Sequence, residues 1–123
     1  MSDPASNSPL RDPNESNWTR LIAVSRCHPG AGTFVEHGGR ELSVFVLDNE
    51  QVFVIDNACP HAGGNLSAGE VNKDVVTCPW HHWQFDLRSG VCIDSAAARV
   101  KKYTARIRDG WVEVQLPGVS SVR

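Results

Sequence analysis

The sequence lacks any long apolar stretch, because its longest wholly apolar runs, such as residues 52–55, contain four residues. A membrane-spanning helix needs about 20 apolar residues, so we expect no membrane partner. The sequence also lacks an excess of one charge, since 12 Lys and Arg residues stand against 14 Asp and Glu residues. Nucleic-acid-binding domains are usually strongly basic, and we therefore expect no nucleic-acid partner. Its 123 residues are enough for one domain with its own core.

The first 17 residues contain little that a folded domain can bury. They hold three of the seven prolines and only three apolar side chains, so burial cannot offset the entropy lost on ordering. We predict a disordered tail at 1–17, a folded domain at 18–118 and a short tail at 119–123. The N-terminus lacks a basic start followed by an apolar stretch, which disfavours a secretion signal and predicts a cytoplasmic location. In a reducing cytosol, cysteines favour metal binding over disulfides.

The chain after residue 17 predicts short strands joined by turns. Apolar residues alternate with polar ones near the end of the chain, as expected for half-buried strands. Segment 37–40 and Asp109-Gly110 contain glycines that suit hairpin connections. No window of 10 to 12 residues has a helical period, although 95–98 can form one turn. We therefore expect an all-β fold, a small sandwich or barrel, with strands over 18–24, 32–36, 41–47, 51–56, 103–108 and 112–116.

Residues 57–90 interrupt this rhythm with two loops that are rich in Gly, Pro, Cys and His. The first loop pairs Cys59 with His61, and the second pairs Cys78 with His81. The pattern is therefore C-x-H, 16 residues, then C-x-x-H. Two thiolates and two imidazoles, delivered from two loops, form a four-ligand set for one soft or borderline metal centre.

Two kinds of centre use such a ligand set. A structural zinc site takes two cysteines and two histidines, but zinc fingers usually bring the cysteines in one pair and the histidines in another. Here each loop mixes one cysteine with one histidine. This arrangement suits a binuclear cluster in which the cysteines hold one iron and the histidines hold the other, the ligand set of Rieske [2Fe-2S] centres. Structural zinc stays the alternative.

The two segments CPHAGGNLSAGEV and CPWHHWQFDLRSGVC resemble the cluster-binding boxes of Rieske proteins of the small soluble ferredoxin kind. This resemblance implies a Rieske-type antiparallel β sandwich or barrel with a small cluster-binding subdomain inserted, and one [2Fe-2S] cluster per chain. It implies that Cys59 and Cys78 bind one iron, and that His61 and His81 bind the other. The exposed edge of the two histidines is then the expected docking surface for partner proteins.

The function implied by the resemblance is one-electron transfer from a reductase to a terminal oxidoreductase such as an oxygenase. No catalytic residue set is visible beyond the cluster ligands, so whether the chain is itself an enzyme stays open. A catalytic domain with a mononuclear iron site is not expected within 123 residues. Segment 100–110 also resembles the small subunit of NAD(P)H-dependent nitrite reductases, the alternative function. Many of those relatives lack the four ligands that are present here.

Several positions depart from other Rieske proteins. Respiratory-chain relatives carry a disulfide between the two loops, at positions that are Gly64 and Trp80 here. They also place hydroxyl groups near the cluster at positions that are Trp83 and Phe85 here. Hydrogen bonds to the cluster sulfurs raise the potential, so we expect a potential toward the low end of the Rieske range. His82 stands where glycine is commoner, and it is an alternative ligand to His81.

The remaining residues of chemical interest have ordinary explanations as well as functional ones. Cys27 and Cys92 are expected to be buried small hydrophobes, and the two histidines at 28 and 37 are expected on the surface. The aromatic residues of the second loop either shield the cluster and form a partner surface or simply pack a small subdomain. A basic strand follows, which is either a solvated face or binds an acidic partner; its residues are Arg99, Lys101, Lys102, Arg106 and Arg108.

Overall fold

The computed structural model describes residues 18–47, 51–60, 63–80, 82–95 and 97–116. The tails predicted at 1–17 and 119–123 lie outside these ranges. The described chain contains three antiparallel sheets, two short 3₁₀ helices and no α-helix, which confirms the all-β prediction. None of its helices has the length and apolar character needed to cross a membrane.

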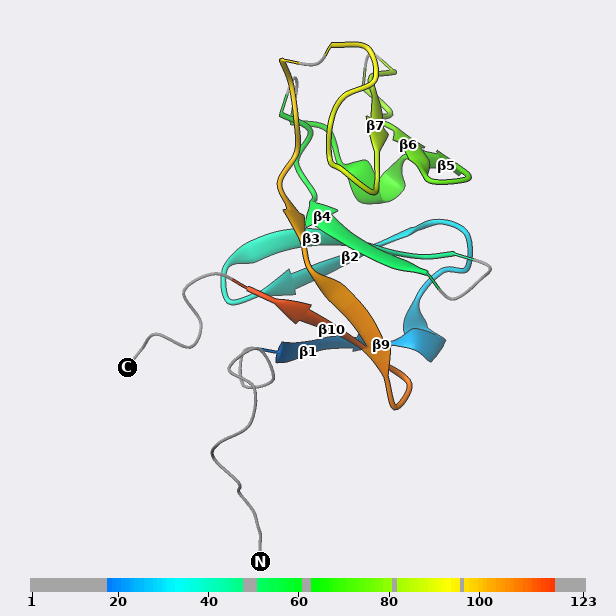
Figure 1. Cartoon of the computed structure of the whole chain (residues 1–123), viewed down its shortest axis with the longest axis vertical. Coiled ribbons are helices and arrows are strands. Elements are labelled where there is room, and N and C mark those ends of the chain that lie inside the picture. The colour runs from blue at the N-terminus through cyan, green and yellow to red at the C-terminus, as the bar shows by residue number, and fades with distance from the viewer. Residues whose placement is uncertain (1–17, 48–50, 61–62, 81, 96, 117–123) are drawn as a thin grey trace, which may run out of the picture.

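The three sheets are nested along the chain, since the first sheet contains strands from both ends and the third lies within one large insertion (Figure 1). The first sheet has the order β1 (Trp18–Ala23), β10 (Trp111–Gln115) and β9 (Ala105–Arg108). The second has the order β2 (Gly32–His37), β3 (Arg40–Val46), β4 (Val52–Asp56) and β8 (Lys102–Tyr103). The third, inserted between β4 and β8, contains β5 (Glu70–Asn72), β6 (Val75–Thr77) and β7 (Gln84–Asp86). The 3₁₀ helices are η2 (Val24–Arg26) and η3 (Leu66–Ala68).

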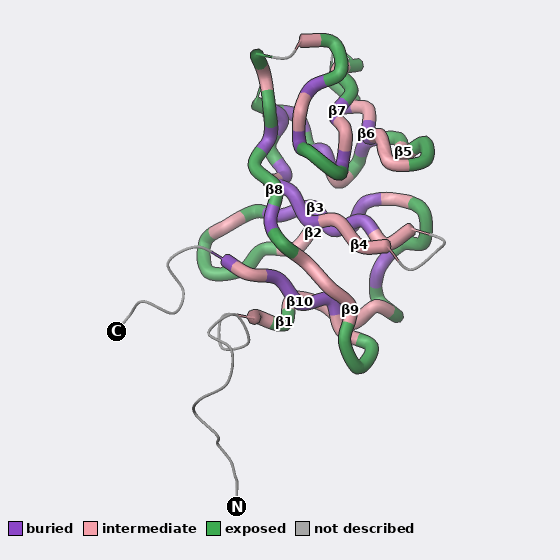
Figure 2. The backbone as a smooth tube through the Cα atoms, viewed as in Figure 1, coloured by how far each residue is buried: buried purple, intermediate pink, exposed green. Residues whose placement is uncertain are grey.

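The central strands β3 and β4 of the four-stranded sheet contribute buried residues to both faces, whereas most of β2 is exposed or half-buried (Figure 2). Alternate side chains of a strand point to opposite faces, and here Leu42 and Val44 pack with Val112 of the first sheet. Phe45 and Ile55 instead pack with the core of the inserted subdomain. This double burial explains why residues 42–46 of β3 are apolar at every position except Ser43.

The insertion contains more regular structure than the sequence predicted. Residues 57–90 were expected to form two loops, but they also contain η3 and all of the third sheet. Its strands have three residues each, and this length is too short to produce a recognisable alternation of apolar and polar side chains.

A single strand over 103–108 was also predicted, and this prediction is wrong. Tyr103 pairs with Val54 in the four-stranded sheet, whereas Ala105 pairs with Val114 in the first sheet. The chain therefore changes sheets at Thr104. Tyr103 and Ala105 both pack against the core between these sheets. The alternation of apolar and polar residues therefore continues across the change of sheets, and the sequence does not reveal where the change occurs.

Tyr103 ties this junction to the start of the insertion. Its ring is buried, and its hydroxyl donates a hydrogen bond to Asp56 Oδ1 at 2.5 Å. A guanidinium nitrogen of Arg40 donates to the same hydroxyl at 3.4 Å. Burial raises the pKa of Tyr103 to about 12, and the bond to the Asp56 carboxylate adds to this shift.

The raised pKa of Tyr103 predicts a loss of stability in alkali. The unfolded phenol ionises near its ordinary pKa of about 10, whereas the folded one ionises near 12. The contribution of this group is therefore complete below pH 10 and is lost as the pH rises to about 12, amounting to about 2 kcal/mol. Tyr103→Phe is expected to lack this component when thermal unfolding is measured across that range. Equal alkaline slopes for wild type and variant would contradict the assignment.

Candidate functional site

Two cysteine thiols come together in the core of the inserted subdomain. Cys59 lies in the loop that follows β4, and Cys78 lies between β6 and β7. Both are buried in the same apolar cluster, and neither forms a disulfide. Burial raises the pKa of Cys78, and a side-chain hydrogen bond with the adjoining Cys59 thiol raises it further. The backbone N–H of Trp80, whose nitrogen lies 3.4 Å from Cys78 Sγ, lowers the pKa and so opposes this shift.

The two histidines that the sequence pairs with these cysteines, His61 and His81, lie outside the described residues. The chain on either side of them is held by backbone hydrogen bonds. Cys59 N–H donates to Gly64 O at 2.8 Å, and Cys78 N–H donates to Trp83 O at 2.7 Å. Across the described ranges, no group of three or more His, Cys, Asp or Glu side chains is placed to hold a metal.

Asn57 fixes the first loop to the four-stranded sheet. Its side chain is 1% exposed, and its Oδ1 accepts hydrogen bonds from Ser43 Oγ at 2.8 Å and from Ser67 N at 3.0 Å. Its Nδ2 donates to Asn65 Oδ1 at 2.9 Å. The backbone of Asn57 also donates to Glu41 O and accepts from Leu66 N. One buried amide therefore joins β3 to both ends of the loop that carries Cys59.

The sequence pattern does not mark Asn57 as a functional residue. The sequence does contain a hint of its role, because Asn57 is a polar residue that lies two positions after the apolar run 52–55 and two positions before Cys59. What the sequence does not contain is the partner, since Ser43 lies 14 residues earlier on another strand. Burial of a polar side chain requires such partners.

The two loops also touch through Gly64 and Trp80. A Cβ atom added at Gly64 would lie 3.0 Å from Cys78 Sγ and 3.2 Å from Trp80 Cβ. Positions 64 and 80 therefore face each other, as expected for the two positions that carry a disulfide in respiratory-chain relatives. Here a close contact between the glycine backbone and the indole replaces that covalent link, and a side chain at position 64 would displace it.

The aromatic residues of the second loop divide into two environments. Phe85 is fully buried in the cluster that contains both thiols, and Trp83 packs against that cluster. Trp80 is 55% exposed. Phe85 thus serves packing, whereas Trp80 presents an apolar surface beside the cysteine loops.

His82 has a backbone conformation that favours glycine. Its φ is +60°, in the left-handed region, and its side chain is exposed. A residue with a Cβ in this region is uncommon. Glycine adopts this conformation without strain, which agrees with glycine being the commoner residue at this position in the resembling proteins.

The other cysteines and histidines behave as predicted. Cys27 is 8% exposed and Cys92 is 2% exposed, so both are buried. His28 and His37 are exposed. Cys92 shares the apolar cluster with the two loop cysteines, and it serves as part of that core.

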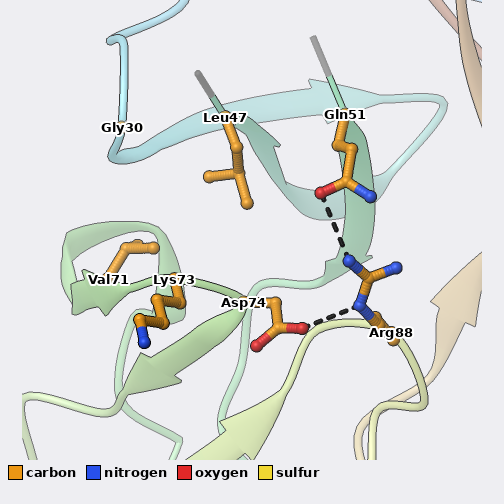
Figure 3. Close-up of a pocket in the computed structure, with 7 residues that line it drawn as sticks. All are labelled: Gly30, Leu47, Gln51, Val71, Lys73, Asp74 and Arg88. Carbon is orange, nitrogen blue, oxygen red and sulfur yellow. Dashed lines mark hydrogen bonds and ion pairs between the residues drawn. The ribbon is translucent and has the colours of Figure 1, made fainter. Parts of the chain in front are cut away.

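A cavity of about 560 Å³ lies between the inserted subdomain and the four-stranded sheet (Figure 3). Arg88 spans it, with its Nε 2.7 Å from Asp74 Oδ2 and its Nη2 3.3 Å from Gln51 Oε1. The guanidinium carbon also lies 5.6 Å from the centroid of the Phe53 ring. The hydrogen bond from Arg88 lowers the pKa of Asp74. Arg88 therefore links subdomain and sheet; the full lining is Gly30, Leu47, Gln51, Val71, Lys73, Asp74 and Arg88.

Residues 17–115 match the family described as the Rieske-like [2Fe-2S] domain. The ferredoxin of Sphingomonas yanoikuyae B1 is 31% identical, with a TM-score of 0.73 over 82% of this chain and 100% of that one. A protein described as an NADH-dependent nitrite reductase small subunit from Mycobacterium tuberculosis is 29% identical, with a TM-score of 0.76 over 83% of this chain and 96% of that one.

Longer proteins also match over the same region. The cholesterol 7-desaturase of Drosophila melanogaster is 32% identical over 111 residues, which are 84% of this chain and 26% of that protein. The chain spans about a quarter or less of the length of the desaturases that it matches. The similarity to these proteins therefore concerns one of their parts.

The Asn57 network predicts a large effect for one substitution and a small effect for its neighbour. Asn57→Ala removes three side-chain hydrogen bonds and leaves the buried Ser43 hydroxyl without its acceptor, so we expect a loss of about 2–4 kcal/mol in the free energy of unfolding. Asn65→Ala removes one bond and leaves the buried Asn57 Nδ2 without its side-chain acceptor, so we expect a smaller loss of about 1–2 kcal/mol. Urea denaturation of the two variants measures the difference. Equal losses would show that Asn57 does not carry the link.

Proposed function

The chain belongs to the Rieske-like [2Fe-2S] domain family, and from this membership we propose that it relays single electrons from a reductase to a terminal oxidoreductase such as an oxygenase. A Rieske-type cluster accepts and releases one electron, at a higher potential than a cluster held by four cysteines. The observation that carries the proposal is the pair of buried thiols, Cys59 and Cys78, which adjoin each other without forming a disulfide.

These two thiols fit the cysteine half of a Rieske ligand set. They come from two loops, as thiolate ligands to one iron would, and the apolar cluster around them excludes water. We assign His61 and His81 to the other iron on their spacing from Cys59 and Cys78. Asn57 holds the first loop against the sheet, and the Cys78–Trp83 backbone bond closes the second.

Partner proteins are expected to dock at the edge that His61 and His81 form. Trp80, between Cys78 and His81 in sequence, supports this because its large apolar surface is exposed there. Exposed aromatic side chains are enriched at protein interfaces. A partner that docks at this edge has the shortest electron-transfer path between its own redox centre and the cluster.

The alternative function, the small subunit of an NAD(P)H-dependent nitrite reductase, is favoured by one observation. The Mycobacterium tuberculosis protein of that description aligns over 96% of its length with a TM-score of 0.76. Co-purification of this chain with a large reductase subunit would support the alternative. Electron transfer to an oxygenase by the free chain would support the ferredoxin function.

Anaerobic purification followed by EPR of the dithionite-reduced protein tests the cofactor. We expect a rhombic Rieske-type signal together with iron and acid-labile sulfide. A colourless protein that contains zinc and no iron would instead establish the structural zinc alternative. A fully iron-loaded sample without the signal would overturn the proposed function.

Substitution of single histidines tests the ligand assignment. We expect His81→Ala to lose the cluster, because it removes a ligand. His82→Gly should retain it and is a suitable control, since glycine fits the left-handed backbone at that position. Iron content and the EPR signal are the measurements. Loss of the cluster in His82→Gly, with retention in His81→Ala, would move the ligand to His82.

The midpoint potential is expected below zero, in the lower part of the Rieske range of about −150 to +300 mV. Neither Trp83 nor Phe85 has a hydroxyl to donate to a sulfur, and such bonds raise the potential. Phe85→Tyr should therefore shift the potential upward, whereas Phe85→Leu should not. Protein-film voltammetry measures all three proteins, and a wild-type value well above zero would contradict the argument.

A further inference from the structure

Three exposed cations lie within four residues of one another, at Arg99, Lys101 and Lys102. We call them the basic stripe. Figure 2 shows the chain running down along one side of the inserted subdomain to β8. In the part of the chain that the structure describes, none of the three forms an ion pair with a carboxylate. Lys101 Nζ lies 5.7 Å from the centroid of the Tyr103 ring.

The basic stripe differs from other basic residues that form ion pairs within the fold. Arg106, which belongs to the same basic strand in the sequence, has its Nε 2.7 Å from Glu113 Oε1. Its guanidinium carbon also lies 4.0 Å from the centroid of the Trp18 ring. Arg106 is therefore engaged on the first sheet, whereas the charges of the stripe face solvent.

The backbone of the basic stripe is held in place at several points. Lys101 O accepts from Asp56 N at 3.0 Å, and Val100 N–H donates to Gly90 O at 2.8 Å. Val100 and Tyr103 are buried on either side of the two lysines. Asp56 precedes the loop that carries Cys59, so the stripe is fixed directly beside the first cysteine loop.

We propose that the basic stripe is a docking surface for an acidic face of an electron-transfer partner protein, an inference that rests on the proposed function. Unpaired charges on a fixed backbone steer a partner of opposite charge and orient it. The inserted subdomain has the opposite sign, since residues 57–98 hold two basic residues against four acidic ones. A partner that approaches the first cysteine loop therefore meets the positive charge of the stripe beside a subdomain of net negative charge.

A second explanation for lysines at this place is protection of a sheet edge. β8 is the outer strand of the four-stranded sheet, and charged side chains on edge strands prevent pairing between molecules. Reversal of charge separates the two explanations. Lys101→Glu/Lys102→Glu keeps the edge charged but removes attraction for an acidic surface.

The experiment measures binding of a fluorescein-labelled oligoglutamate peptide to the full chain by anisotropy. The matched control is Arg26→Glu/Lys73→Glu, which makes the same change in net charge at exposed cations outside the stripe. We expect Lys101→Glu/Lys102→Glu to weaken binding about tenfold or more and the control to weaken it about twofold or less. Addition of salt to about 0.15 M should reduce wild-type binding.

Equal weakening in the two double variants would overturn the proposal, because it would show that only net charge matters. Aggregation of Lys101→Gln/Lys102→Gln together with unchanged peptide binding would assign the lysines to edge protection. Tighter binding of a DNA oligonucleotide than of the peptide, lost in Lys101→Glu/Lys102→Glu, would overturn the assignment to a protein partner. The peptide assay does not depend on electron transfer, so its result is separable from failure of the proposed function.

The loaded chain provides a second test. Oxidation of the reduced cluster by the anion ferricyanide should slow several-fold in Lys101→Glu/Lys102→Glu relative to Arg26→Glu/Lys73→Glu, and oxidation by a cationic cobalt(III) complex should accelerate. The same rates in both variants would show that the stripe does not act on electron exchange.

Discussion

The side chain of Asn57 is buried between the four-stranded sheet and the first cysteine loop, and both of its polar atoms have hydrogen-bond partners. A buried polar group that loses its partners costs more than the bond contributed, so this residue tolerates only one arrangement of the loop. That arrangement places Cys59 against Cys78 in a common apolar cluster. The position of the first thiol is thus set by a hydrogen bond to Ser43, a residue of the sheet below.

The central strands of the four-stranded sheet make this possible because both of their faces are buried. One face forms the core shared with the first sheet, and the other face supports the inserted subdomain. Phe45 and Ile55 contribute to the same cluster as the two thiols. The two thiols therefore lie on a well-packed sheet, and Arg88 forms a second link between subdomain and sheet.

Charge is distributed on this framework in two ways. Some charged groups pair within the fold, as Arg106 does with Glu113, whose carboxylate is almost fully buried. Others, such as Lys101 and Lys102, are exposed on a fixed backbone. Sequence composition treats these arginines and lysines alike, because it contains no information on which cation has a carboxylate within reach.

The sequence by itself determined the fold class and the family, and it contains the Cys and His spacing from which the ligands are proposed, because these depend on short-range spacing and on residue types. It also predicted most strands of the first two sheets, and the Gly38-Gly39 turn, in which both φ values are positive. It did not determine the third sheet, whose strands are too short to show a period, or the change of sheets at Thr104. Only the tertiary structure brought Asn57 to Ser43 and Gly64 to Trp80. The reason is physical: such contacts join residues far apart in sequence, and packing decides which of them meet.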